Sequence, residues 1–264
     1  MKIGVFDSGL GGLAIAQSII RRLPEFDYIY LGDTKRVPYG NRSQTTIHEF
    51  VGEALSYLFA QDCELVILAC NTASAESLRK SQQEYLPVNF PDRRVLGVLI
   101  PAVEAALEIS SNGTLAVLAT ASTVESGAYE KEVHRQSPGS HLMSIAAPLL
   151  VPLVENDGVK YIRPILADYL QPLKEHSIDA MILGCTHYCL IKDMVREMVA
   201  CPVISQDEVV PKKLATYLER HPEITSRLSR GATRNYQVTD LSPGYEDMVR
   251  RLAGEPLELQ RVNL

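Results

Sequence analysis

The stretches LVILACNTASA, residues 65–75, and AMILGCTHYCL, residues 180–190, share one pattern. In each, an apolar run ends at a small residue and a cysteine, and side chains with hydroxyl or amide groups follow. Short apolar runs rich in Val, Ile and Leu predict buried strands. The chain therefore sets a thiol, Cys70 or Cys185, directly after each of two predicted strands.

Similar apolar runs recur along the chain and alternate with stretches of helical periodicity. The predicted strands are residues 3–6, 28–31, 65–69, 95–99, 115–118, 143–146, 180–183 and 202–204, and the predicted helices are residues 13–23, 45–61, 73–85, 102–109, 159–173 and 191–199. This alternation predicts an α/β fold with mainly parallel sheets. Ligands bind such sheets at the carboxyl ends of the strands, so the residues that follow the strands are the candidates for a site.

The two halves of the chain carry a faint internal repeat. GVFDSG near the start resembles AVLATAS near the middle, and VILACNT resembles MILGCTH. When Asp7 is matched with Ala119, the two cysteines follow at nearly equal separations. We expect two pseudo-symmetric α/β domains with the active site in the cleft between them. The first comprises residues 1–95 and about 208–264, the second residues 96–207, and the residues from Pro243 onward dock without forming a core element of their own.

Composition and charge indicate an ordinary folded protein. Of the 264 residues, 46% are hydrophobic and 22% charged, and the net charge is −6. The only notable basic cluster, Arg227, Arg230 and Arg234, is sparse, so no nucleic-acid partner is expected. The first apolar run breaks at Asp7, too early for a signal peptide or a membrane span. Five cysteines without a scaffold spacing indicate reduced thiols, and we expect a cytoplasmic protein with no membrane partner.

A pair of thiols suits proton transfer at a carbon atom. Sulfur passes readily between thiol and thiolate, and the reference pKa of cysteine is about 8.5. A lone cysteine after a strand is more often a small buried hydrophobe, but two in matched contexts favour a site with Cys70 and Cys185 on opposite sides of one carbon. Cys63, Cys189 and Cys201 lack such contexts and are assigned to packing.

His187 stands two residues beyond Cys185, where an imidazole can take or give the proton of the thiol. Cys185, His187 and Cys189 could also bind a metal ion, since sulfur and imidazole are good ligands. Their C-x-H-x-C spacing does not match the usual zinc knuckles, and no second cluster supplies a fourth ligand. We therefore expect no metal.

The segment IGVFDSGLGG, residues 3–12, resembles a phosphate-binding glycine loop but lacks both the dinucleotide fingerprint and the P-loop lysine. Its Asp7 could assist a thiol and its Ser8 could bind a polar ligand, and either could also cap a helix.

The segment LGDTKRVPYGNRS, residues 31–43, contains a turn with several basic neighbours. The backbone N–H groups of Tyr39 and Gly40 could bind a carboxylate, although a plain surface turn fits the pattern equally well. Asn71, Thr72 and Thr186 add neutral hydrogen-bonding groups after the strands that carry the thiols.

These segments together resemble the cofactor-independent aspartate/glutamate racemase family. The matching stretches, between residue 3 and about residue 192, are IGVFDSGLGGL, YLGDTKRVPYGNRS, LACNTASA, GVLIPAVEAAL, VLATASTVESGAY, PLLVPLVE and LGCTHYCLI. The resemblance implies two α/β domains and racemisation of glutamate without a cofactor. One thiolate would remove the α-proton while the opposite thiol delivers a proton to the other face, with Cys70 usually serving the D isomer.

The resemblance also implies roles for matching positions. Cys70 and Cys185 would be the acid/base pair, assisted by Asp7, Glu155 and His187. The substrate contacts would be Asp7, Ser8, Tyr39, Gly40, Asn71, Thr72, Thr120, Thr123, Thr186 and His187. Racemases of this family are frequently homodimers, and their D-glutamate supplies peptidoglycan for the cell wall. Two departures, Cys189 in place of a common Pro and Ala147 in place of a frequent Cys, touch no proposed catalytic position.

Other functions fit parts of the pattern. A racemase of this family for aspartate, or for a broader set of acidic amino acids, differs by one methylene, which is worth only about 1–3 kcal/mol of discrimination. A cysteine hydrolase or acyltransferase could use Cys185 and His187 as nucleophile and base, but it leaves Cys70 without a role. A non-catalytic acid-binding protein would need neither thiol.

Overall fold

The computed structural model describes residues 1–156 and 158–264. In chain order its elements, where η marks short 3₁₀-helices and the π-helical η2, are β1 (Lys2–Asp7), α1 (Leu13–Arg22), β2 (Tyr28–Gly32), η1 (Tyr39–Asn41), α2 (Gln44–Ala60), β3 (Cys63–Leu68), α3 (Asn71–Lys80), η2 (Ser81–Tyr85), α4 (Leu86–Asn89), β4 (Arg94–Gly97), α5 (Leu99–Ile109), β5 (Thr114–Ala119), α6 (Ala121–Glu125), α7 (Ala128–Gln136), β6 (His141–Ala146), α8 (Leu150–Glu155), α9 (Val159–Leu170), η3 (Gln171–Glu175), β7 (Ala180–Gly184), η4 (Thr186–Ile191), α10 (Lys192–Met198), β8 (Val203–Ile204), α11 (Gln206–Arg220), α12 (Pro222–Thr225), β9 (Arg234–Val238), α13 (Tyr245–Ala253) and β10 (Leu259–Arg261).

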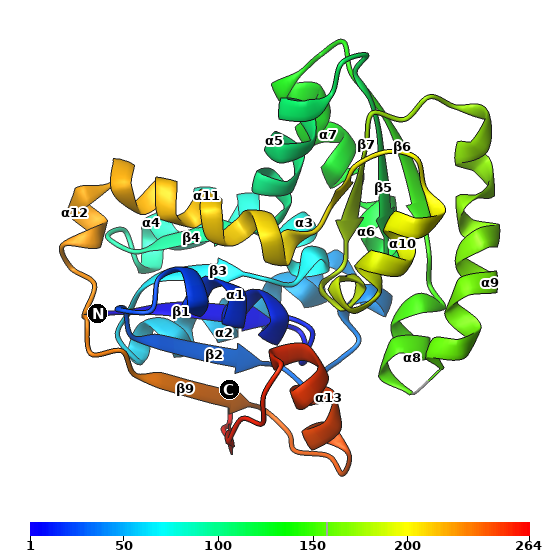
Figure 1. The fold of residues 1–264 in the computed structure, drawn as a ribbon. Helices are drawn as coiled ribbons and strands as arrows, with labels where there is room; N and C mark the ends of the chain where they lie inside the picture. Colours follow the sequence, from blue (N-terminus) through cyan, green and yellow to red (C-terminus); the bar gives the residue numbers. More distant parts are fainter. Residues whose placement is uncertain (157) are drawn as a thin grey trace.

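Over these described residues the strands form two parallel sheets (Figure 1). The first has the strand order β10-β9-β2-β1-β3-β4, and the second has the order β6-β5-β7-β8. The order β2-β1-β3-β4 of the first sheet thus recurs as β6-β5-β7-β8 in the second. The predicted α/β class and its pseudo-symmetry are confirmed, with β5 as the counterpart of β1 and β7 as the counterpart of β3.

The strand register repeats as well. Leu68 of β3 pairs with the penultimate residue of β1, and Leu183 of β7 pairs with the penultimate residue of β5. Cys70 and Cys185 each lie two residues beyond these paired leucines. The two thiols therefore occupy equivalent positions beyond the carboxyl ends of two central strands.

Helices cover both faces of each sheet, which explains why the strands read as continuous apolar runs. Against the first sheet, α1, α11 and α13 share one hydrophobic core, and α2 and α3 share another (Figure 1). Against the second sheet, α5 and α7 pack on one side, and α9 and α10 pack on the other. Four apolar cores thus hold the strand ends in place around the candidate site.

The C-terminal region differs from the prediction. β9 and β10 extend the first sheet beyond β2, and α13 buries Met248, Val249 and Leu252 in the core next to α1. The expectation that residues from Pro243 onward form no core element was therefore wrong, although they do pack against the first sheet. α13 escaped prediction because four of its nine residues are charged and its apolar stripe is short.

The crossover regions also differ in detail. The predicted strand 95–99 ends at Gly97, because Leu99 already starts α5. The helix α11 was not predicted, and it packs against both α1 and α5. The domain division after residues 95 and 207 stays a prediction.

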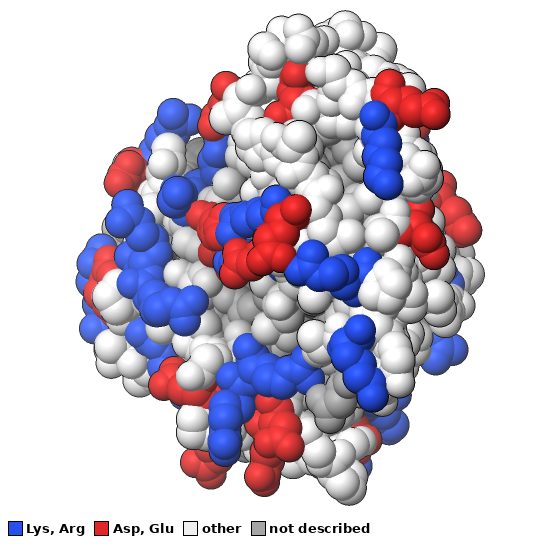
Figure 2. Space-filling model, turned by 45° about the vertical axis from the view of Figure 1, so that its right-hand side comes forward, with Lys and Arg blue, Asp and Glu red and all other residues white. Residues whose placement is uncertain are grey.

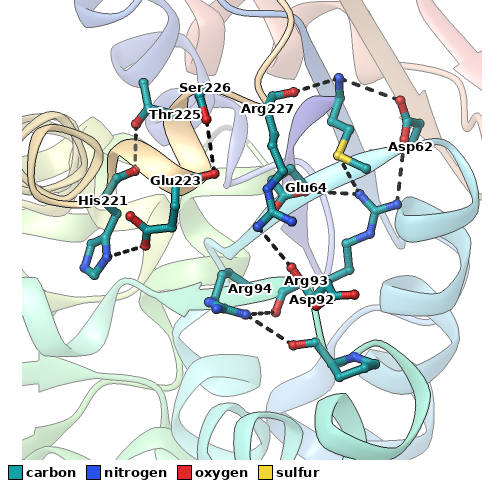
Figure 3. A network of polar contacts seen from close by, with 12 residues as sticks. Asp62, Glu64, Asp92, Arg93, Arg94, His221, Glu223, Thr225, Ser226 and Arg227 are labelled. Atoms are coloured by element: carbon teal, nitrogen blue, oxygen red, sulfur yellow. Dashed lines mark hydrogen bonds and ion pairs between the residues drawn. The ribbon is translucent and has the colours of Figure 1, made fainter.

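A network of ion pairs ties together the amino ends of the strands, away from the thiols (Figure 3). Glu64 of β3 is fully buried and lies 2.6 Å from Arg227 and 3.3 Å from Arg93. Arg93 also lies 3.7 Å from Asp62. Because a buried carboxylate is costly without partners, the two guanidinium groups offset the burial of Glu64 and fix the segment after α12 to the sheet.

The surface carries charges of both signs. On the face shown in Figure 2, Lys and Arg side chains lie interspersed with Asp and Glu side chains. Arg196, for example, forms ion pairs with Asp193 and Glu208. Within residues 1–156 and 158–264, no helix combines the length and the apolar character needed to cross a membrane.

Candidate active site

The two predicted thiols are almost fully buried beyond the carboxyl ends of β3 and β7. Cys70 is 6% exposed, caps α3 by accepting the Ala73 N–H at 3.5 Å, and has its Sγ 3.2 Å from the Oγ of Ser8. Cys185 is 8% exposed, and its Sγ lies 3.9 Å from Nδ1 of His187. Each sulfur thus has a polar partner from a segment that sequence analysis singled out.

The environment of Cys70 favours the protonated thiol. Burial is the main cause, and together with the negative charges of Asp7 and Cys185 it raises the pKa of Cys70 to about 12, against the hydrogen bonds from Ser8 and Ala73. At neutral pH the resting Cys70 therefore carries a proton that it can give away.

Asp7 is a buried carboxyl group beside both thiol segments. Its Oδ2 accepts the backbone N–H of Gly9 at 3.0 Å, and its Oδ1 has no hydrogen-bond partner among the described residues. Burial raises the pKa of Asp7, whereas the positive charge of His187 and backbone hydrogen bonds lower it. The free oxygen can accept a hydrogen bond from an ammonium group or take a proton from a thiol.

His187 lies between Cys185 and Glu155. Its Nδ1 faces the sulfur, and its Nε2 is 2.8 Å from Oε1 of Glu155, the last residue of α8. Burial opposes the charged ring, but the contacts with Cys185 and Glu155 outweigh it and raise the pKa of His187 to about 10. The imidazole is therefore protonated at neutral pH and can donate to Cys185.

The glycine-rich loop after β1 lies directly against the segment of the second thiol. A Cβ atom on Gly11 would come within 2.3 Å of Thr186 Oγ1 and within 2.8 Å of His187 Nδ1. A Cβ atom on Gly12 would come within 2.5 Å of Cβ of Asp7. Since only glycine permits such close approach, these residues bring the Asp7 loop and the Cys185 segment together.

Threonine hydroxyl groups from both halves of the chain meet in one cluster. Thr72 of α3 lies 3.4 Å from Thr120 and 3.3 Å from Thr123, measured between Oγ1 atoms. Thr120 precedes α6 and donates to Thr123 at 2.9 Å. A Cβ atom on Gly40 would lie 3.9 Å from the Thr120 side chain. Three of the predicted hydroxyl groups, those of Thr72, Thr120 and Thr123, therefore lie together beside the predicted turn.

A polar cleft of about 650 Å³ opens beside this cluster. It is lined from both halves, by Gly40, Asn41, Arg42, Ser43, Gln44, Glu76, Ser122, Glu125, Ser126 and Lys131. It can admit a small charged molecule, and Gly40 connects it to the threonine cluster. A second cavity of about 750 Å³ is lined mainly by β4, α5 and α11 rather than by the predicted site residues.

Two predicted contact residues use their side chains inside the protein. The Tyr39 hydroxyl donates to Asp33 at 2.6 Å, and its ring packs beside Phe50. The Asn71 amide is bonded to Gln206. For a ligand, the available group of Tyr39 is then the backbone N–H that sequence analysis named, and Asn71 likewise offers the N–H at the start of α3.

Gln206 and Tyr129 belong to this region, although sequence analysis named neither as a site residue. Gln206 is the first residue of α11 and follows β8, so it stands beyond the carboxyl end of a strand, as the thiols do. That position could have identified Gln206 as a candidate from the sequence, because polar residues after parallel strands are the usual site residues. Tyr129 is the last residue of the segment VLATASTVESGAY, and no other feature of the sequence marks it as a site residue.

Cys189, which closely follows Cys185 in the sequence, packs against the core beside α1. Burial and the negative charge of Asp207 raise the pKa of Cys189 to about 12. Across the part of the chain that the structure describes, no three side chains of His, Cys, Asp or Glu are grouped as ligands for a metal ion.

Two matched parallel sheets, each with a buried thiol beyond a central strand, define an α/β protein suited to proton transfer from two sides. Residues 3–209 match the family described as Asp/Glu/Hydantoin racemase, and the chain belongs to this family.

The similarity extends over the whole chain. The glutamate racemase of Persephonella marina is 35% identical over 266 residues, which cover 100% of this chain and 98% of that protein. Glutamate racemase isoform RacE1 of Bacillus anthracis superposes with a TM-score of 0.89 at 32% identity, covering 100% of this chain and 97% of its own. The Francisella tularensis glutamate racemase, solved in complex with D-glutamate, gives 0.88 at 30% identity, covering 99% and 97%.

Proposed function

We propose that this protein interconverts L- and D-glutamate by moving protons at Cα between two thiols. The observation that carries the proposal is the full-length likeness to glutamate racemases, at 35% identity for the Persephonella marina protein. The buried thiols at equivalent positions of the two sheets supply a chemical basis for it.

In the proposed mechanism, one thiol acts as base and the other as acid. With D-glutamate, the Cys70 thiolate removes the α-proton and the Cys185 thiol delivers a proton to the opposite face; with L-glutamate the roles are exchanged. Asp7 takes up the proton that Cys70 must lose before it acts as a base. His187, held by Glu155 and already protonated, stabilises the Cys185 thiolate when Cys185 acts as the base, and it donates a proton back to Cys185 when Cys185 acts as the acid.

The difficult step is the formation of negative charge at Cα beside a carboxylate. Hydrogen-bond donors that are already in place reduce this cost without reorganisation during the reaction. The proposed donors are the N–H groups at the start of α3 and the hydroxyl groups of Ser8, Thr72, Thr120, Thr123 and Thr186. Backbone N–H groups of Tyr39 and Gly40 would bind a substrate carboxylate.

Several finer features follow from the family rather than from the geometry. We propose glutamate over aspartate because the similar proteins named above are glutamate racemases. The D-glutamate formed would supply peptidoglycan synthesis in the cytoplasm. A homodimer stays a prediction, which light scattering coupled to gel filtration tests.

The proposal is tested by incubating the wild-type protein with L-glutamate and L-aspartate in parallel, with no added cofactor. We expect the circular dichroism signal of glutamate to decay to zero, and kcat/KM for glutamate to exceed that for aspartate. Faster turnover of aspartate would favour the aspartate racemase instead. Constant signals with both amino acids, or an acyl-enzyme detected by mass spectrometry, would overturn the proposal.

A further inference from the structure

A buried hydrogen-bond network joins the surroundings of the two thiols. The side-chain amides of Gln206 and Asn71 exchange two hydrogen bonds, each of 2.7 Å. The hydroxyl of Tyr129 donates to Oδ1 of Asn71 at 2.7 Å and accepts from Nε2 of Gln206 at 3.0 Å. The same Nε2 also lies 3.4 Å from the carbonyl oxygen of Val98. Gln206 thus contacts every other member of the network.

The network is closed to solvent. Gln206 and Asn71 are each 3% exposed and Tyr129 is 2% exposed. A buried donor or acceptor that loses its partner costs about 1–3 kcal/mol. The three side chains therefore hold one another in a single arrangement, because rotation of any of them leaves a buried group without a partner.

The members of the network stand next to the two thiols. Asn71 directly follows Cys70 and is the first residue of α3. Tyr129 packs in the same hydrophobic core as Ala180 and Ile182 of β7, the strand that leads directly to Cys185. Gln206 begins α11, which packs against α1, α5 and η4. Gln206 therefore sits where the chain passes from the second sheet to the helix that contacts both halves.

We propose that Gln206 is a positioning residue that sets the placement of the two thiols relative to each other, by tying Asn71 to Tyr129. The inference rests on the proposed function. Gln206 acts through its two partners and not on the reacting carbon. The role needs a side chain with both a donor and an acceptor at this length, which leucine, of similar size, does not provide.

The test compares Gln206→Leu with a matched variant, Gln17→Leu. Gln17 of α1 is also buried and donates to a tyrosine hydroxyl, that of Tyr236 in β9, at 2.8 Å. Because small misplacements of reacting groups cost up to about 100-fold in rate, we expect kcat of Gln206→Leu to fall by about tenfold or more while KM changes little. Gln17→Leu should lower the thermal midpoint similarly and keep its kcat.

A double-mutant cycle separates positioning from simple loss of stability. Tyr129→Phe removes only the hydroxyl that Gln206 and Asn71 share, so it should also lower kcat. Because the two side chains act as one unit, the double variant with Gln206→Leu should be no slower than Gln206→Leu alone. All rates are measured well below the thermal midpoint of each variant. If Gln206→Leu does not fold, Gln206→Asn, which keeps the amide but is shorter, takes its place.

An unchanged kcat in Gln206→Leu, or in its replacement Gln206→Asn, would overturn the inference. An equal loss of kcat in Gln17→Leu, or additive effects in the cycle, would do the same. These outcomes are distinct from failure of the proposed function, in which the wild-type protein itself does not racemise glutamate.

Discussion

At the scale of single residues, the site depends most on the protonation states of a few buried side chains. Burial and neighbouring negative charge raise the pKa of Cys70, and contacts with Cys185 and Glu155 raise the pKa of His187. In the resting protein Cys70 is then a neutral acid, and His187 is a cation beside the other sulfur. The two thiols are chemically inequivalent, although the sheets that carry them are arranged alike.

We expect the ring of His187 to stay protonated up to a pH of about 10. This folded-state pKa lies above the unfolded value of 6.5. The protonated ring therefore stabilises the folded protein fully below pH 6.5, and this stabilisation is lost as the pH rises through about 10. An NMR titration of the ring checks the value, and Glu155→Gln should lower it. A wild-type ring that titrates near its unfolded value would refute this account of the ion pair.

Gly11→Ala should impair catalysis, because its Cβ atom would overlap Thr186 and the ring of His187. We expect a loss of about tenfold or more in kcat/KM, since the loop must shift by a sizeable fraction of an ångström or more. Gly139→Ala is the matched control, as nothing lies within 4 Å of its Cβ position. Equal kcat/KM values in the two variants would show that the close approach has no role.

At the scale of secondary-structure elements, α13 is the piece that most changes the expected fold. Its residue Leu252 is 5% exposed and lies in the core shared with α1, the helix that follows the glycine-rich loop. The helix thus supports the site from outside, without lining it.

Leu252→Ala should lower the free energy of unfolding by about 2–4 kcal/mol, through lost burial and the cavity left behind. Leu241→Ala is the control, since Leu241 is 46% exposed and its truncation should cost less than about 0.5 kcal/mol. Urea denaturation measures both. A Leu252 variant as stable as the control would mean that α13 does not anchor α1.

The elements also show which parts of the site can be predicted from the sequence. Cys70 and Cys185 were found because each follows an apolar strand, which is a local pattern. The partners of the Asn71 side chain were not found, because Gln206 lies 135 residues away and only the folded chain brings the two together. The contacts of the Tyr39 side chain inside the protein could not be predicted for a similar reason, since they depend on Asp33 and on an aromatic ring of α2.

At the scale of the whole molecule, the order β2-β1-β3-β4 in the first sheet matches the order β6-β5-β7-β8 of the second. The repeat was visible in the sequence because the strand ends carry similar residues, and the buried strands of each half alternate with helices. β9 and β10 lie outside the repeat, so the pattern of the other half gave no indication of them. The contacts of Thr72 with Thr120 and Thr123 join the halves at the site.

A ligand that bridges the halves should stabilise the whole fold. At a concentration of about 100 times its dissociation constant, D-glutamate should add about 2.7 kcal/mol to the free energy of unfolding. Cys70→Ser should retain most of this gain, because the contacts proposed for binding lie elsewhere. Thermal unfolding with and without D-glutamate measures the effect, and the absence of any shift in the wild-type protein would speak against binding in the cleft.

The most direct test of the two-thiol account is solvent deuterium incorporation at Cα of glutamate, in D₂O, by the wild-type protein and by the Cys70→Ser and Cys185→Ser variants. We predict that the wild-type product carries deuterium at Cα, and that each variant racemises about 10²–10⁴-fold more slowly, as expected when a positioned acid or base is lost. Undiminished racemisation in either variant would contradict the account.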